Sequence, residues 1–96
     1  MTRLADLARV VRSKNAGPTM LTIDILFAEA ASFERAAPVL TAARISEIYA
    51  VEASVIVCRP ALAIKIVMPR GLIAGDPGDR DVYGAQQHAP LLDLDI

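Results

Sequence analysis

The sequence holds few of the residue types that build metal centres, disulfides or stacking surfaces. It has one cysteine, one histidine and no tryptophan among 96 residues. A single thiol, that of Cys58, excludes an internal disulfide and a metal site made of several thiolates within one chain. Two phenylalanines and two tyrosines offer little surface for base stacking. The net charge of −1 is also unlike the positive charge that proteins use to bind phosphate backbones. We therefore expect no binding to nucleic acid.

Long apolar runs and well-known catalytic motifs are also missing. No segment reaches the ~18–20 apolar residues of a membrane span, and Arg3 and Arg9 flank no apolar stretch typical of a signal peptide. The chain contains no glycine-rich phosphate fingerprint, no Ser-His-Asp order and no His-Glu-x-x-His motif. These absences favour a cytoplasmic protein that binds no membrane, no metal and no cofactor.

The length of the chain limits where a site can lie. With 96 residues we expect one domain, residues 1–96. Such a domain buries roughly 60–70% of the surface that its unfolded chain exposes, which suffices for a modest core but not for an enclosed cavity. A functional site is therefore expected at an interface with another chain or another copy.

Hydrophobic periodicity predicts the elements of the fold. Apolar residues at helical spacing predict a first helix over residues 2–13, which the turn-forming segment 15–18 ends; they are Leu4, Leu7, Ala8 and Val11. Two further helices are expected at 29–37 and 41–50, and strands at 20–27, 53–59, 62–68 and 91–96. Pro69 should end the strand 62–68, since proline lacks a ladder donor. Cys58, in the apolar run SVIVC, is interpreted as a small core residue.

This order of elements predicts an α+β fold. Strands with helices packed on one face form a two-layer sandwich, here with a mostly antiparallel sheet of three to four strands. The arrangement is a ferredoxin-like variant in which a long loop replaces the second helix.

The loop Gly75–Leu92 is the segment that ordinary connections explain least. It has no hydrophobic period, and connections in small domains are usually about 4–6 residues long. Long irregular loops commonly carry function. Histidine is the residue type most often used for proton transfer, and His88 can act with Tyr83 as a general acid and base. Three acids in the loop can either bind a cation or form turns; they are Asp76, Asp79 and Asp81.

Further polar residues can anchor an anion or close an interface. The segment 12–15 combines two cations, a hydroxyl and an amide, although cations at a helix C-terminus explain it equally well. Asp24 and Lys65 are lone charges on the polar faces of two strands, where they can pair across the sheet or leave Lys65 to bind an anion. The predicted binding residues are Arg12, Ser13, Lys14, Asn15, Lys65, Arg70, Gln86 and Gln87.

Four segments of the chain resemble a known family. RSKNAGP (12–18), LTIDILF (21–27), AIKIVMPR (63–70) and GDRDVYGAQQHAPLL (78–92) are similar to the small bacterial proteins grouped as domain of unknown function 4387. Members of that family occur beside, or fused to, the acyclic terpene utilisation protein A family. The resemblance implies a partner of a larger protein in the catabolism of branched or terpenoid acids and their thioesters.

Three functions are consistent with these features. In the first, the chain is a subunit, inactive alone, that docks on a larger terpene-utilisation-type protein and helps form its active site. In the second, it is a self-associating lyase or hydratase that acts on an acyl thioester or hydroxy acid through His88 and Tyr83, with anion anchors at Arg12, Lys14 and Arg70. In the third, it is a structural assembly domain. Each of them implies a homo- or hetero-oligomer.

Overall fold

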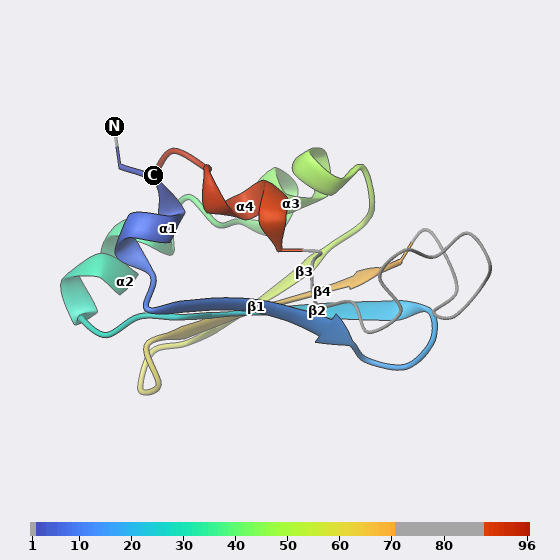
Figure 1. Cartoon of the computed structure of the whole chain (residues 1–96), viewed down its shortest axis with the longest axis horizontal. Helices are drawn as coiled ribbons and strands as arrows, with labels where there is room; N and C mark the ends of the chain where they lie inside the picture. The colour runs from blue at the N-terminus through green and yellow to red at the C-terminus, as the bar shows by residue number, and fades with distance from the viewer. Residues whose placement is uncertain (1, 71–87) are drawn as a thin grey trace.

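The structure, a computed structural model, describes residues 2–70 and 88–96. Its described part contains a four-stranded antiparallel sheet with helices gathered on one face (Figure 1). The strands are β1 (Val10–Asn15), β2 (Met20–Leu26), β3 (Ser54–Cys58) and β4 (Ala63–Pro69). The helices are α1 (Leu4–Leu7), α2 (Ala30–Ala36), α3 (Ala42–Tyr49) and α4 (Ala89–Leu92). The predicted two-layer α+β fold is confirmed.

The strand order is β1-β2-β4-β3, so β1 and β3 are the two outer strands. β2 and β3 both run antiparallel to β4 and are therefore parallel to each other, with α2 and α3 in the connection between them. This unit has the connectivity of the first part of a ferredoxin-like fold. The other neighbour of β2 is β1, which comes from the N-terminal side of the chain.

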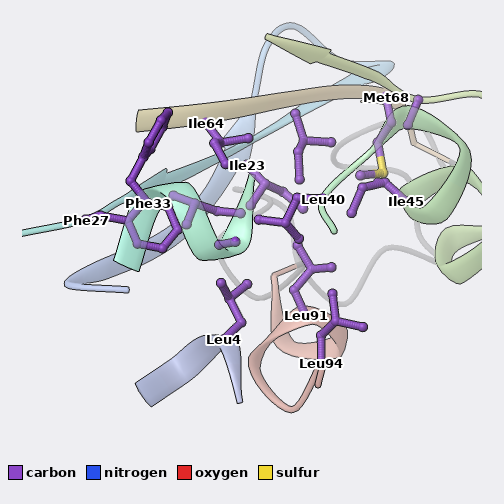
Figure 2. Packing of buried hydrophobic residues seen from close by; sticks show 14 of the residues in the cluster. Leu4, Ile23, Phe27, Phe33, Leu40, Ile45, Ile64, Met68, Leu91 and Leu94 are labelled. Atoms are coloured by element: carbon purple, nitrogen blue, oxygen red, sulfur yellow. The ribbon is translucent and has the colours of Figure 1, made fainter. Parts of the chain in front are cut away.

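The core lies between the sheet and the helices (Figure 2). Alternation along β2 and β4 directs one set of side chains to the covered face of the sheet, the face under the helices. Ile23 lies opposite Ile66 in the register, and both are fully buried. The helix layer contributes further buried side chains, namely Leu4, Phe33, Leu40, Ile45 and Leu91. The alternation predicted for 62–68 is confirmed.

Residues 2–13 do not form the predicted single helix. α1 ends after one turn, because Ala8 is extended and the Arg9 amide donates to the Leu26 carbonyl at 2.7 Å. The chain then continues as β1, paired with β2 over its whole length. The same apolar spacing fits either one long helix or a short helix followed by a strand. Pairing with β2 favours the second arrangement. Residues 12–15 therefore lie in a strand and not at a helix end.

The C-terminal segment is also different from the prediction. Residues 91–96 do not form a strand, since α4 occupies residues 89–92 with Pro90 in its first turn, where proline is favoured. Leu91 and Leu94, three residues apart, are both buried. In place of a strand, this segment forms an isolated bridge between Arg3 and Asp95.

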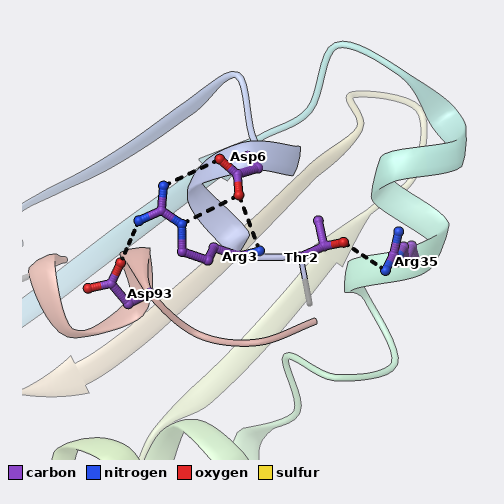
Figure 3. A network of polar contacts seen from close by, with 5 residues as sticks. All are labelled: Thr2, Arg3, Asp6, Arg35 and Asp93. Atoms are coloured by element: carbon purple, nitrogen blue, oxygen red, sulfur yellow. Dashed lines mark hydrogen bonds and ion pairs between the residues drawn. The ribbon is translucent and has the colours of Figure 1, made fainter.

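The two ends of the chain lie side by side (Figure 1). The Ile96 amide donates to the Thr2 carbonyl at 2.8 Å. Arg3 pairs with Asp6 and with Asp93 in an exposed network (Figure 3). The hydrogen bond from the Arg3 side chain lowers the pKa of the Asp6 carboxyl. Ion pairs this exposed contribute little to stability, so backbone pairing is the main tie between the termini.

Cys58 corrects a third prediction. It is exposed, and Ile56 and Val57 beside it are 55% and 45% exposed. The run SVIVC resembles a buried strand in composition, but β3 is an outer strand with β4 on one side only. Position in the sheet leaves these apolar side chains in solvent.

Candidate functional site at the β1 edge

The structure brings Ser13 of β1 against His88, which immediately precedes α4. Ser13 Oγ lies 3.3 Å from His88 Nδ1, although the two residues are 75 positions apart in the chain. Ser13 is a buried residue, at 6% exposure. His88 is held in place because the Leu91 amide donates to its carbonyl at 3.0 Å and the Leu91 side chain is in the core.

A hydroxyl at this distance from one ring nitrogen does two things to an imidazole. It fixes the orientation of the ring, and it accommodates either tautomer, since a hydroxyl can either donate to Nδ1 or accept from it. The remaining nitrogen, Nε2, is then set as the acceptor or the donor for a reacting group. An oriented histidine is the basic requirement for general acid–base chemistry.

A second polar pair lies farther along the same edge. Arg70 donates from a guanidinium nitrogen to Asn15 Oδ1 at 2.7 Å, and its amide donates to the Thr19 carbonyl at 2.8 Å. Asn15 is two residues from Ser13 on β1, so strand alternation points both side chains to the covered face. Four predicted site residues, Ser13, Asn15, Arg70 and His88, thus form two contacts beside β1.

The other predicted cations lie on the opposite face of the sheet, which we call the open face. Arg12 and Lys14 alternate with Ser13 along β1 and are exposed. The register aligns Arg12 with Asp24 and Asp24 with Lys65 in one row across three strands. The expected cross-strand neighbours, Asp24 and Lys65, are therefore adjacent, but the ion pair of Asp24 is with Arg12, at 3.6 Å.

The sheet therefore separates three of the predicted cations from the histidine. Arg12, Lys14 and Lys65 lie on the open face, while Ser13 and His88 meet on the covered face. A small carboxylate or acyl thioester bound against one group does not reach the other, because the backbone layer lies between them. Within the described residues the chain does not gather one substrate between all of these groups.

Several predicted residues lie outside the described part of the chain. These are Tyr83, Gln86 and Gln87, together with the possible cation ligands Asp76, Asp79 and Asp81. The tyrosine that the structure does describe is Tyr49, whose pKa is raised to about 12 by burial. Its phenol therefore stays protonated near neutrality and is not suited to act as a base.

Sequence reasoning did not identify a shallow hollow at the end of β3. Arg59 in its wall pairs with Glu34 and lies over the ring of Phe33, with its guanidinium carbon 5.5 Å from the ring centroid. No signal in the sequence marks this hollow, because an uncharged run such as SVIVC is equally typical of a buried strand and of an outer one. The hollow is lined by Ala37, Pro38, Val57, Cys58, Arg59 and Pro60.

Fold and site together define a small α+β domain with oriented polar pairs at one outer strand of an antiparallel sheet. The chain belongs to the family described as domain of unknown function DUF4387, whose model matches residues 4–95. The family resemblance expected from the four sequence segments is thereby confirmed. No curated protein and no solved structure matches the chain significantly. In the described residues, no helix has the length and apolar character needed to cross a membrane.

Proposed function

We propose that the chain is a small partner subunit that docks on a larger protein along β1 and helps form that protein's active site. The observation that carries the proposal is the separation of Arg12 and Lys14 from the Ser13–His88 contact by the sheet. A domain of this size has no room to enclose a substrate between these groups. A larger protein that covers the β1 edge can contact both sides of the strand at once.

The chemistry of β1 fits such a partner. Two cations project from its open side and a buried serine holds a histidine on its covered side. Among the described residues, β1 is hydrogen-bonded to a strand on one side only, that of β2. Exposed cations at the rim of an interface guide association with an acidic surface and suppress wrong partners. We therefore expect carboxylates on the docking surface of the larger protein.

The larger protein would be of the acyclic terpene utilisation type, by the family association that the resemblance implies. Its substrates would be branched or terpenoid acids or their acyl thioesters. In this role His88, oriented by Ser13, transfers a proton at the shared site, with Tyr83 as its proposed companion. Arg70 and Asn15 line the same edge, and the two glutamines, Gln86 and Gln87, are proposed to orient the substrate or close the interface.

Co-expression tests the docking step. A tagged copy of the chain is expected to retain a co-expressed terpene-utilisation partner on an affinity resin. The double substitution Arg12→Glu and Lys14→Glu should release the partner, because like charges facing each other across an interface cost several kcal/mol. Arg44→Glu, an exposed change on α3, is the matched control and should have no effect. Failure of the unsubstituted chain to retain the partner would refute the proposal.

Turnover by the assembled complex tests the contribution to the active site. His88→Ala should leave the complex intact and lower turnover of a branched acyl thioester by about 10²–10⁴-fold, the usual range for a lost general acid or base. An intact complex with unchanged turnover would show that His88 does not contribute to catalysis and would favour the structural assembly domain.

A second candidate function rests on the Ser13–His88 contact itself. An oriented histidine is equally what a self-associating lyase or hydratase requires, with His88 and Tyr83 as acid and base. In that case the purified chain, without any partner, should turn over a hydroxy acid or acyl thioester, and His88→Ala should abolish this activity. Turnover that appears only after the larger protein is added would exclude this candidate.

A further inference from the structure

The outer strand β3 is an apolar edge exposed to solvent. Four of its five residues are exposed, and Ile56 and Val57 are its large hydrophobic members. Among the described residues, β3 pairs only with β4, which leaves the outer row of amides and carbonyls available. Proteins commonly protect such an edge with charges, prolines or bulges. The run SVIVC contains none of these residues, so another strand is the natural cover for this edge.

The sequence of β3 is complementary to itself. In an antiparallel pair centred on Ile56, that residue faces its own copy, Val55 faces Val57, and Ser54 faces Cys58. Two-fold contacts place the same surface on both sides, so a charge at the central position would face its own copy. β3 has no charge, and each facing pair joins residues of similar size and polarity. Nothing in the strand therefore opposes pairing with a second copy.

Both faces of the sheet gain from this pairing. Ile56 lies in the open-face row with Lys65, while Val57 lies opposite Ile64, whose side chain is in the core. The pairing therefore buries Ile56 against Ile56 on one face and valines on the other. The register also brings Ala53 of the second copy opposite Arg59, beside the hollow that Ala37 and Pro38 line. The segment before β3 of one copy thus covers the hollow of the other.

We infer that the chain forms a two-fold dimer in which β3 pairs antiparallel with β3 of a second copy. Two sheets of four strands then join into one continuous sheet of eight strands. The dimer leaves β1 at the far edge of each copy, so it does not depend on the proposed function and does not compete with it.

Engineered disulfides test the register directly. In a Cys58→Ser background, Ile56→Cys places the two introduced thiols on facing residues, whose Cα atoms lie about 4.5–5.5 Å apart in an antiparallel pair. That spacing is within the range of a disulfide. Ser54→Cys in the same background is the control, because its two copies are offset by four residues, about 13 Å along the strands. We expect a covalent dimer under oxidising conditions for Ile56→Cys alone.

A cross-link for Ser54→Cys as strong as that for Ile56→Cys would overturn the register, and so would no cross-link for either. Ile56→Lys in the otherwise unchanged chain provides a second measurement that needs no new thiol. It places a cation opposite its own copy, and sedimentation should show a monomer with an unchanged circular dichroism spectrum. Ala42→Lys on the exposed start of α3 should remain a dimer. A monomeric unsubstituted chain, or a dimeric Ile56→Lys variant, contradicts the inference.

Discussion

β1 and β3 are the two outer strands of one sheet, yet their sequences treat the edge in opposite ways (Figure 1). β1 reads VVRSKN, with two cations exposed on one side and a buried serine in contact with His88 on the other. β3 reads SVIVC, with no charge and with apolar side chains in solvent. Charged outer strands resist pairing with themselves, whereas neutral apolar ones favour it. Because of this difference, we propose a different kind of partner for each edge.

The largest effect is expected from Leu91→Ala, which removes core packing beneath the β1 edge. Leu91 is fully buried, and its loss should lower the free energy of unfolding by about 2–5 kcal/mol. Because α4 positions His88, the contact with Ser13 should weaken as well. Urea unfolding measures the first effect. The control is Val57→Ala on exposed β3, which should weaken the dimer and change unfolding of the monomer little. Equal loss of stability in the two variants would contradict the comparison.

Two turn substitutions beside the edges should act with opposite signs. Gly17, in the turn between β1 and β2, has φ +92°, and an added Cβ would meet nothing within 4 Å. Gly17→Ala should therefore cost about 1 kcal/mol through backbone conformation alone. Ala50 ends α3, shortly before β3, with φ 56°. Ala50→Gly should stabilise the fold by roughly 0.5–1 kcal/mol, since glycine adopts this conformation without strain. Thermal unfolding measures both changes in stability. A change of the same sign for the two variants would show that φ does not determine the stability of these turns.

Removing one hydroxyl should change the β1 edge with little effect on the fold. Ser13→Ala deletes the contact to His88 Nδ1 and should cost about 0.5–1.5 kcal/mol, the usual net value of a hydrogen bond. Loss of this contact should change the tautomer ratio of the imidazole, which nitrogen-15 chemical shifts of the ring report. An unchanged tautomer ratio would mean that Ser13 does not orient His88. The β3 dimer should keep its mass in this variant.

The smallest expected effect is that of salt concentration on the affinity of the two interfaces. Charges at a protein surface are screened beyond about 10 Å at 0.1 M ionic strength, and more strongly as salt increases. Binding of the larger partner through Arg12 and Lys14 should therefore weaken several-fold as salt rises. Pairing of β3 with its copy involves no charge and should stay constant or become tighter. Titrations at two salt concentrations give both values, and parallel weakening would argue against an apolar β3 interface.

Much of the fold was predictable because local sequence patterns determine it. Alternation located β2 and β4, and Thr41, at the start of the range predicted for the third helix, caps α3 by accepting a hydrogen bond from the Arg44 amide at 3.2 Å. The prediction of one helix over residues 2–13 was wrong because the same apolar residues fit a helical turn followed by a strand. The prediction of a strand at 91–96 was wrong because Pro90 starts a helix that alternation of the leucines concealed.

The site was predictable in its neighbourhood but not in its geometry. The enzyme hypothesis combined His88 with anion anchors from the segment 12–15 in one site, and the contact of Ser13 with His88 does join the two segments. The sequence did not reveal that Arg12 and Lys14 lie on the other face, because that separation arises only when the segment is a strand. The exposure of Cys58 was equally hidden, since an outer strand and a central one can have the same composition.

The most direct test of two edges with two partners is native mass spectrometry of the co-expressed complex. We predict two copies of the chain together with the larger protein. Arg12→Glu with Lys14→Glu should remove the larger protein and keep the dimer of the small chain. Ile56→Lys should separate the two copies while each still binds the larger protein. The account of separate edges is wrong if either variant abolishes both associations. It is also wrong if both associations survive in both variants.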